Sequence, residues 1–463
     1  MIRKAIVEGK FYPDNKKELM DFLSSSFENG ERKSRIILTP HAGYVYSGRT
    51  AAKSFSHLID DFETVIVIGT AHTMYLKRCA TLRDCVFSNC LGDVKTDDEV
   101  IDILLEDEGF ENNPKAHLSE HSVEVQLPFL QFLKKDFKLV PIVSNSEDKS
   151  VLLSAAKKIA DLMKKNKKIA LVISSDLSHY PPYEIAYISD NAIGLSYDAA
   201  IANKNVDYFY LTKDLLSQKY RKLLDTVACG FSPMVVGLGV AYFMDCNEFE
   251  IMEYTNSGDV TEAREEVVGY LSGMFVKSNR KDFRLNLDEK EKQYLLALSK
   301  KSIENYLKTG NFLKIDYFQY PKLNLPAAVF VTLTIDKELR GCIGCLAPHM
   351  LLGDAVIDYS VRAAFEDPRF SPLTESELKK IDIEISILSP LKKINNTSEI
   401  KENVHGVFVK KGFLSGTYLP QVWENFSNKE DFLRSLFDDK SGIGFEKINA
   451  SDTEIYIYTV EKI

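Results

Sequence analysis

Three apolar segments in the first half of the chain each run directly into a loop that carries a histidine. They are RIILTPHAGYVYSG with His41, TVIVIGTAHTMY with His72, and IALVISSDLSHY with Asp176 and His179. Short apolar runs bounded by turn residues are typical of buried strands. In an open α/β sheet, catalytic and ligand-binding groups collect just beyond the carboxyl ends of the strands. The pattern therefore indicates a sheet whose strand ends share one polar pocket.

Strand-like and helical segments alternate around these three runs. In chain order we predict strand 35–39, strand 64–69, helix 97–106, strand 138–143, helix 150–164, strand 169–174 and a last strand within 265–276. Alternation of this kind is typical of a mostly parallel sheet with flanking helices. We therefore expect an α/β domain in the first half of the chain.

Length and charge limit the classes of protein to consider. At 463 residues the chain is long enough for two or three domains. No run approaches the roughly 18 apolar residues of a membrane span, and the N-terminal MIRKAIVEGKFYPDN lacks the apolar core of a secretory signal. A formal charge of −9 gives no general attraction to nucleic acid or anionic lipid, although a local basic patch remains compatible with it. We expect neither nucleic acid nor a membrane as partner.

The cysteines are scattered along the chain and odd in number. The seven are Cys79, Cys85, Cys90, Cys229, Cys246, Cys342 and Cys345. A disulfide framework is disfavoured by this odd number and by the size of the protein. We therefore expect a protein of the reducing cytoplasm.

The second half shows a different rhythm of predicted elements. The polar stretch 277–290 breaks the alternation, and a helix capped by Asp288 follows it. Strand-like runs then occur at 327–336, 381–389, 406–416 and 454–460, with a helix near 350–366. Because these strands cluster without a helix between each pair, we expect a separate α+β domain. We assign residues 1–277 to the first domain, 278–286 to a linker and 287–463 to the second.

The candidate metal site combines His41, His72 and Cys229, the last in DTVACGFSP. Neutral imidazole suits iron, copper and zinc, and a thiolate favours the softer metals of that group. Asp176 lies three residues before His179, so the carboxylate could orient the imidazole, or both could face one pocket. The alternatives are ordinary: a histidine after a strand is often a satisfied polar residue, and a free cysteine is often a small buried hydrophobe.

The segment SEHSVEVQLPFLQFL (119–133) has two interpretations. Glu120 and His121 could reach the pocket. Alternatively the segment is a helix or strand edge whose polar residues are solvated. The residues alone slightly favour the second interpretation.

Six strings together resemble the Memo family, which is similar to class III extradiol dioxygenases. They are PHAGYVYSG, GTAH, EHSVEVQLPFL, SSDLSH, ACGFSP and SGDV with VVGY, spread over residues 1–277. The resemblance implies Fe(II) as the metal, with copper a second choice and zinc a third. It implies His41 and His72 as ligands, Cys229 in the position of the dioxygenase glutamate, and His179 as the acid/base residue. We expect Asp176 to manage protons together with His179. Substrate would then bind over the metal, framed by Tyr44, Tyr46 and His121.

Two motifs mark the second half, LRGCIGC (339–345) and RAAFEDPRFSPLT (362–374). The arginines Arg340, Arg362 and Arg369 could bind an anion, but arginines in turns are more often structural. Cys342 and Cys345 could form a redox pair or half of a metal site, yet no second pair is present to complete a zinc site.

The same motifs resemble the AMMECR family over about residues 287–463. With the Memo resemblance they imply two components of the AmmeMemoRadiSam system fused in one chain, with a radical S-adenosylmethionine enzyme as partner. The substrate, a small molecule or a peptide, is not specified.

Three functions are compatible with the sequence. The first is a redox enzyme with a mononuclear metal site. The second is a non-catalytic metal- or ligand-binding or adaptor protein with a degenerate dioxygenase pocket. A zinc hydrolase ranks third, because it explains the ligand types but not the resemblance.

Overall fold

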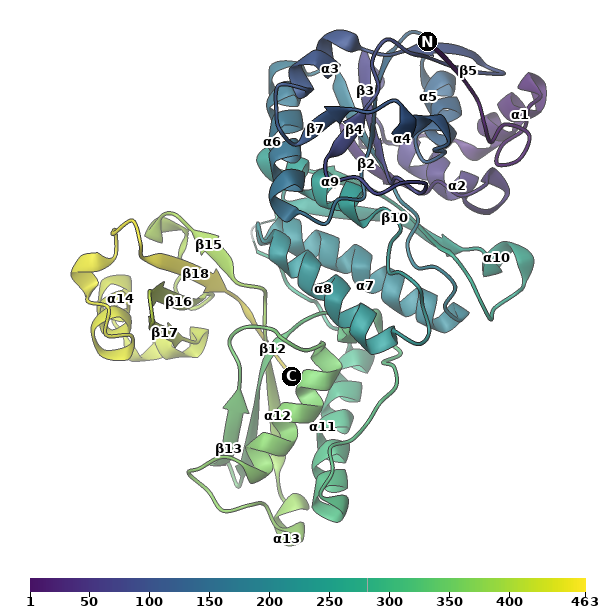
Figure 1. Cartoon of the computed structure of the whole chain (residues 1–463). Helices are drawn as coiled ribbons and strands as arrows, with labels where there is room; N and C mark the ends of the chain where they lie inside the picture. Colours follow the sequence, from purple (N-terminus) through teal and green to yellow (C-terminus); the bar gives the residue numbers. More distant parts are fainter. Residues whose placement is uncertain (281) are drawn as a thin grey trace. The chain divides into compact units, whose positions relative to one another are not determined.

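The computed structural model describes residues 1–280 and 282–463. Its chain divides into two compact units: Met1–Ile201 with Leu216–Asn279, and Ala202–Leu215 with Arg280–Ile463 (Figure 1). Within the described residues, no helix combines the length and the apolar character that crossing a membrane requires.

The first unit is built on an eight-stranded sheet. Its order is β10 (Glu248–Asn256), β11 (Gly269–Val276), β2 (Ile36–Thr39), β9 (Ile169–Ser174), β3 (Thr64–Gly69), β8 (Lys138–Val143), β4 (Cys79–Thr81) and β7 (Phe110–Asn112). The four central strands β2, β9, β3 and β8 are parallel. Strand β11 runs antiparallel to both of its neighbours, β10 and β2, and β4 runs antiparallel to β8. The predicted mostly parallel sheet is confirmed.

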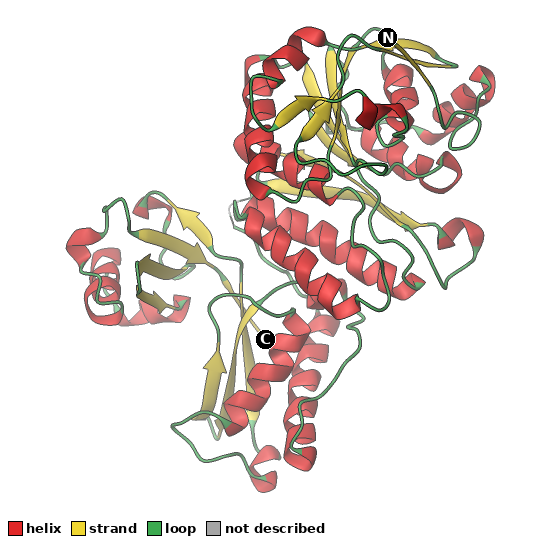
Figure 2. Cartoon of the chain, in the orientation of Figure 1, coloured by secondary structure: helices red, strands yellow, loops and turns green. Residues whose placement is uncertain are grey.

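Helices cover both faces of this sheet (Figure 2). The helices of the first unit are α1 (Lys16–Ser26), α2 (Tyr44–Phe55), α3 (Asp98–Leu104), α4 (Lys115–Leu118), α5 (Leu127–Leu133), α6 (Lys149–Lys165), α7 (Tyr183–Ala202), α9 (Phe231–Phe243) and α10 (Gly258–Thr261). The helix α8 (Val206–Tyr220) belongs to the second unit as far as Leu215. Val172 of β9 packs in the apolar core that α1, α2 and α5 share, whereas Ile173 lies against Gly237 of α9. Successive strand residues point to opposite faces, so α2 and α9 lie on opposite sides of the sheet.

A second, three-stranded sheet lies at the N-terminus. It consists of β1 (Ile2–Lys4), β5 (Val86–Asn89) and β6 (Gly92–Lys95), with β1 parallel to β5. The buried guanidinium of Arg3, on β1, donates from Nε to the carbonyl of His117 at 2.7 Å. The strand β1 is thereby tied to the segment that leads to His121.

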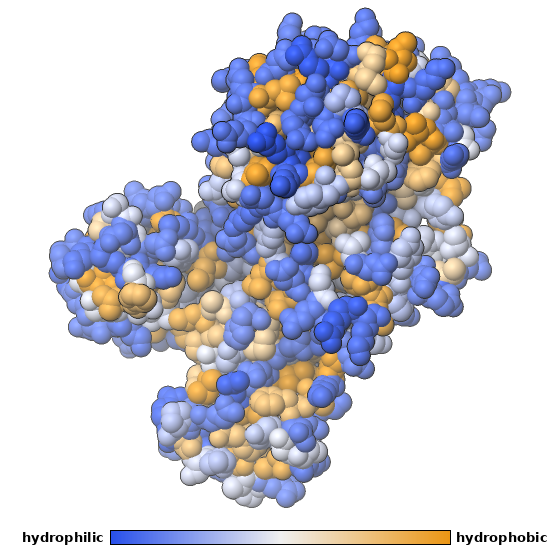
Figure 3. Space-filling view, viewed as in Figure 1, coloured by the Kyte–Doolittle hydropathy of each residue, from blue (hydrophilic) through white to orange (hydrophobic). Residues whose placement is uncertain are grey.

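The second unit has two four-stranded sheets. The first has the order β13 (Glu338–Gly344), β12 (Ala328–Ile335), β14 (Asp382–Leu388) and β19 (Val460–Lys462); the second has the order β15 (Lys392–Ile394), β18 (Glu454–Tyr458), β16 (Gly406–Lys411) and β17 (Leu414–Tyr418). Its helices include α11 (Glu289–Thr309), α12 (Leu352–Phe365), α13 (Glu375–Leu378) and α14 (Lys429–Ser435). The separate α+β region is confirmed. In the face drawn in Figure 3, hydrophilic side chains dominate, with apolar ones scattered among them.

Candidate metal centre

The topology of the main sheet explains why distant histidines meet. Strands β2, β9 and β3 are neighbours and parallel, so their carboxyl ends open at the same edge. His41 follows β2 by two residues, Asp176 follows β9 by two, and His72 follows β3 by three. Cys229 lies just before α9, and His121 lies three residues before the 3-10 turn Glu124–Gln126. The strand ends therefore supply three of these groups directly.

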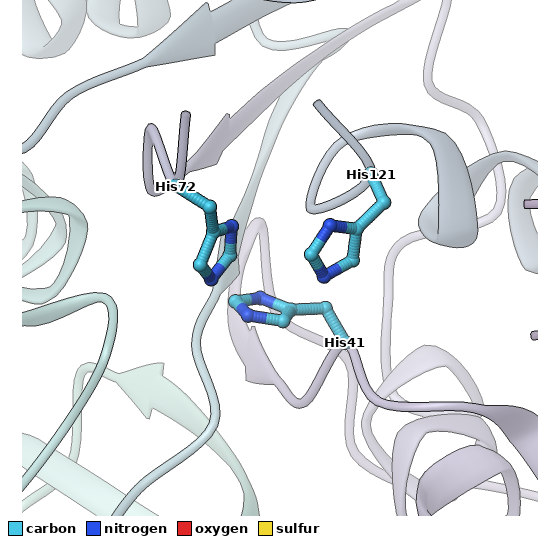
Figure 4. A group of neighbouring side chains, drawn as sticks. All are labelled: His41, His72 and His121. Atoms are coloured by element: carbon cyan, nitrogen blue, oxygen red, sulfur yellow. The ribbon is translucent and has the colours of Figure 1, made fainter. Parts of the chain in front are cut away.

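Three imidazole rings converge at this edge. The ring centroids of His41 and His72 are 5.2 Å apart, those of His41 and His121 are 5.5 Å apart, and those of His72 and His121 are 4.6 Å apart. One ring nitrogen from each residue lies within 4.8 Å of the other two. Figure 4 shows the three rings facing one another across a small gap. This spacing is that of a group able to hold one metal ion.

Glu120 orients the ring of His72 and lies near the ring of His121. Its Oε1 accepts a hydrogen bond from Nδ1 of His72 at 3.0 Å and lies 3.5 Å from Nδ1 of His121. Burial opposes ionisation of this carboxyl, but the hydrogen bonds and charge of His72 outweigh it and hold the pKa of Glu120 well below its usual range. A carboxylate at Nδ1 fixes the tautomer and leaves Nε2 with its lone pair free.

The hydroxyl of Ser174 fixes the tautomer of His41. Its hydroxyl donates to the carbonyl of Ser122 at 2.6 Å, so Oγ must accept from its other neighbours. Those are Nδ1 of His41 at 3.0 Å and Nε2 of Gln126 at 2.9 Å. Because Nδ1 of His41 carries the proton, Nε2 is unprotonated in the neutral ring and can bind a metal.

Burial keeps two of these rings neutral. It lowers the pKa of His41 to about 3, with the nearby charge of His72 as the next cause. Burial likewise lowers the pKa of His121 to about 4, with His41 as the next cause. Protons therefore do not compete for these nitrogens near neutral pH.

A second group of possible ligands shares His41 with the first. It joins Nε2 of His41 to Sγ of Cys229 at 3.2 Å and to Oδ2 of Asp176 at 3.9 Å. The other carboxylate oxygen of Asp176 accepts from the backbone N–H of His41 at 2.7 Å. Burial raises the pKa of both Cys229 and Asp176, the former aided by the charge of the latter. The predicted ligands His41, His72 and Cys229 are thus divided between two groups that overlap at His41.

Nε2 of His179 has no hydrogen-bond partner among the described residues. Its backbone is fixed, since its N–H donates to the carbonyl of Thr226 at 3.1 Å. Its Nε2 is buried, and no described residue hydrogen-bonds to it. Burial lowers the pKa of His179, and the charge of Asp176 opposes this shift. A buried polar atom without a partner costs free energy, so Nε2 of His179 fits a site that receives a ligand. The donor set and this nitrogen together fit a metal centre with a bound molecule beside it.

Both halves of the chain are similar to known protein families. A sequence model described as Memo-like protein matches residues 3–274. The chain belongs to the Memo-like protein family. A model described as AMMECR1 matches residues 296–463, so both domains occur in one chain. The recognition made from the sequence strings is confirmed.

Archaeal and bacterial relatives match the Memo-like part over nearly their whole length. A MEMO1 family protein of Methanococcoides burtonii is 38% identical over 274 residues, which cover 58% of this chain and 98% of that protein. A MEMO1 family protein of Aquifex aeolicus is 34% identical over 280 residues, covering 59% and 99%. The relatives therefore correspond to the first part of this chain alone.

Two solved structures show weaker similarity. The uncharacterized protein PH0010 from Pyrococcus horikoshii is 33% identical and covers 36% of this chain and 88% of that one, with a TM-score of 0.33. The uncharacterized protein JW3007 from Escherichia coli K12 is 13% identical and covers 51% and 98%, also with a TM-score of 0.33.

The polar residues of the segment 119–133 are not solvated, although the sequence slightly favours that interpretation. Glu120, Glu124 and Gln126 are all buried. Glu124 pairs with Arg3, and Gln126 donates from Nε2 to the carbonyl of Pro40 at 2.9 Å. These partners lie more than 80 residues away in the sequence, so local periodicity carries no signal of them. The interpretation in which Glu120 and His121 reach the pocket agrees with the geometry.

The two tyrosines expected to frame a substrate differ in their exposure to solvent. Tyr44 is buried, and its hydroxyl donates to the carbonyl of Val125 at 2.7 Å. It therefore belongs to the apolar core beneath the site, and the expectation of a substrate contact is wrong for it. Tyr46 is 41% exposed and remains available at the surface.

The candidate anion-binding arginines Arg340 and Arg369 of the AMMECR1 domain bind neighbouring residues of the same domain. Arg340 donates from Nε to Glu377 at 2.8 Å and from Nη2 to the carbonyl of Ser371 at 2.8 Å. Cys342 and Cys345 are free thiols, and Oγ1 of Thr332 lies 3.3 Å from Sγ of Cys342. Arg369 pairs with Asp367 at 2.7 Å. These contacts agree with the structural interpretation of the arginines.

Proposed function

We propose that the Memo-like domain is a metal-dependent redox enzyme with one mononuclear metal site. The observation that carries the proposal is the cluster of one ring nitrogen each from His41, His72 and His121. Nε2 of His179 supports it, because this atom is buried and has no hydrogen-bond partner among the described residues. The contacts of Glu120 with His72 and of Ser174 with His41 support it, because they place the ring proton on Nδ1 and leave Nε2 unprotonated.

Fe(II) is the first choice of metal, copper the second and zinc the third. Imidazole suits all three, and the resemblance to class III extradiol dioxygenases favours iron. His41 and His72 are the proposed common ligands, and the third is Cys229 or His121. When bound, iron or copper would supply electron transfer and activation of an oxidisable substrate.

The residues around the site would divide the remaining work. Nε2 of His179 would take up or deliver a proton, a task that suits an imidazole near neutral pH. Asp176 would act as a positioning residue, since its Oδ1 holds the backbone of His41. Tyr46 would contact the substrate from the exposed side of the site.

Metal content of the full-length protein, purified without oxygen, tests the proposal. We expect near-stoichiometric iron or copper in wild type, lost in His41→Ala and in His72→Ala. Comparison of Cys229→Ala with His121→Ala identifies the third ligand as the one whose removal releases the metal. His349→Ala is the matched control, because His349 is exposed in the AMMECR1 domain. Metal-free wild type, even after Fe(II) or copper is supplied, would contradict the proposal.

Binding without turnover is the second candidate function. One observation favours it: Sγ of Cys229 stands 3.2 Å from Nε2 of His41, where the resemblance expects a glutamate. The variant His179→Gln separates the two functions. An enzyme should keep its metal in this variant but lose metal-dependent oxygen consumption, whereas a binding protein should show no such consumption even as wild type.

We further propose a radical S-adenosylmethionine enzyme as partner and the cytoplasm as the place of action. The union of Memo-like and AMMECR1 domains in one chain supports the partner, because fusion keeps both at high effective concentration near one target. The free thiols support a reducing compartment. Calorimetric titration with a purified radical S-adenosylmethionine enzyme of the same organism tests the partnership, and absence of binding to the full chain would count against it.

A further inference from the structure

A second cavity lies in the first unit at the end of the sheet opposite the histidines. It surrounds the start of β2, whereas His41 follows the other end of that strand. Its volume is about 230 Å³, and its wall comes from residues 32–36, 244–246 and 275–277. A single ordered water needs only about 10–15 Å³, so the space admits a small molecule.

The wall of this cavity is basic. Its residues include Arg32, Lys33, Arg35 and Lys277, and none of its residues is acidic. The chain as a whole has a formal charge of −9. A concentrated positive cluster in such a chain raises the local concentration of anions.

Hydrogen bonds to backbone carbonyls hold the guanidinium of Arg35 in place but do not use all of its nitrogens. Its Nε donates to the carbonyl of Ile169 at 3.0 Å, and its Nη2 donates to the carbonyls of Met163 and Asn166 at 2.7 Å each. These carbonyls belong to the C-terminal end of α6 and the segment after it, where the helix dipole offsets about half a charge. The guanidinium is thus fixed in place, and Nη1 is its one nitrogen from which no described residue accepts a hydrogen bond.

The other cations differ in how well they are neutralised. Lys277 is exposed and has no ion-pair partner among the described residues. Arg32 pairs with Glu250 at 2.7 Å and Lys33 with Asp60 at 2.9 Å, and all four side chains are substantially exposed. Exposed pairs of this kind contribute little and are screened by salt. Asp61 acts electrostatically on Arg35 and Glu248 lies 4.0 Å from Arg32, so Lys277 is the cation of the wall that no described carboxylate pairs with.

We infer that this cavity is a binding site for a compact phosphate-bearing ligand. Nη1 of the fixed Arg35 guanidinium and the ammonium of Lys277 are charged donors, and charged donors form strong hydrogen bonds with phosphoryl oxygens. The volume lies below the roughly 300–1,000 Å³ of sites for drug-sized ligands, so the ligand is free phosphate or a small phosphate monoester and not a dinucleotide. The inference does not depend on the proposed metal chemistry.

Titration with inorganic phosphate and with glycerol 3-phosphate, followed by calorimetry of the full chain at low salt, tests the site. We expect saturable binding that weakens about threefold to fivefold in Lys277→Gln, the size of one exposed charge contact. Arg35→Lys keeps the charge but removes the Nη1 donor and the carbonyl contacts that fix it, and should weaken binding as well. Lys95→Gln, an exposed change on β6, is the matched control and should bind as wild type does.

The two probes distinguish the source of the phosphoryl group. Tighter binding of glycerol 3-phosphate indicates a monoester, and equal affinities indicate free phosphate. No saturable binding of either probe, or equal affinities of wild type and both cavity variants, overturns the inference. His41→Ala should bind phosphate normally, so failure of the metal proposal and failure of this one are separable.

Discussion

The carboxylate of Glu120 hydrogen-bonds to both the ring and the backbone of His72. One carboxylate oxygen accepts from Nδ1 of the ring at 3.0 Å, and the other accepts from the backbone N–H at 2.7 Å. The first oxygen also accepts from the backbone N–H groups of His121 and Ser122, each at 2.8 Å. One buried carboxylate therefore sets the position of two candidate ligands.

Replacing Glu120 with glutamine should weaken metal binding without removing a ligand. The amide keeps one acceptor oxygen but turns two donors toward N–H groups, and it removes the negative charge that supports the Nδ1 proton of His72. Loss of an outer-shell partner of this kind typically costs about 10–100-fold in metal affinity. Competition with a chromogenic chelator measures the change. Glu63→Gln is the control, since Glu63 is exposed; equal affinities of Glu120→Gln and wild type would contradict the assigned role.

Arg3→Met should destabilise the first unit. Arg3 and Glu124 form an ion pair at 2.7 Å with side chains 3% and 2% exposed. Removing the guanidinium leaves a buried carboxylate without its cation, which costs about 3–5 kcal/mol of unfolding free energy. Hydrogen exchange of peptides covering residues 1–12 and 117–130 reports the local loss.

The control for this change is Lys158→Met. Lys158 pairs with Glu106, whose side chain is 68% exposed, so about 0–1 kcal/mol is expected. If Arg3→Met exchanges no faster than this control, the pair does not stabilise the segment that carries His121.

Sequence patterns predict where the strands of this protein end. They do not predict the residues that hydrogen-bond to the histidines after those strands. The predicted strands 64–69, 138–143 and 169–174 coincide with β3, β8 and β9, because uninterrupted apolar runs between turn residues leave little choice. Adjacent parallel strands then bring His41, His72 and Asp176 together by topology alone. By contrast, Ser174 orients His41 only through contacts with Ser122 and Gln126. Such contacts join segments about 50 residues apart and leave no periodic trace.

The helix α7 illustrates a second limit. It is buried on nearly every side, including at Asp190, Ala192 and Tyr197. Amphipathic spacing is the sequence signal of a helix, and a helix buried all round shows little of it. The sequence pattern therefore predicts no element for this segment.

Asp190 should make the first unit less stable as pH rises from about 4 to about 7. Its carboxyl is buried, and burial raises its pKa to about 7, although hydrogen bonds from Ser178 and Tyr254 oppose the shift. The ordinary pKa of an unfolded aspartate is about 3.9. Between these values the folded state binds the extra proton, so the unfolding free energy falls with rising pH and becomes flat above about 7.

The comparison of wild type with Asp190→Asn isolates this group. The neutral amide should remove the decline while keeping an acceptor for the backbone N–H of Ser178. Urea unfolding followed by circular dichroism at several pH values measures both slopes. Identical pH dependence in the two proteins would show that Asp190 does not titrate in this range.

Asp367→Asn should destabilise the AMMECR1 domain by loosening the edge of its sheet. Oδ2 of Asp367 accepts from the backbone N–H of Cys342 at 2.8 Å, and Nη2 of Arg369 donates to the carbonyl of Cys342 at 3.2 Å. Cys342 lies on the edge strand β13, so these side chains take the place of a neighbouring strand. Hydrogen bonds from Arg369, opposed by burial, hold the pKa of Asp367 well below its usual range. This contribution is present above about pH 4 and is lost as the pH falls below it.

The expected cost is about 1–3 kcal/mol, the value of a buried hydrogen-bonding group left with a poorer partner. The single tryptophan of the chain makes the measurement selective. Trp423 stacks on Phe432 with ring centroids 3.6 Å apart in the second unit, so its fluorescence in urea follows this unit and not the Memo-like domain. Asp382→Asn, an exposed change on the same sheet, should leave the midpoint unchanged. Equal midpoints for Asp367→Asn and Asp382→Asn would mean that the D-P-R turn does not clasp the strand, and the motif would then be free for a binding role.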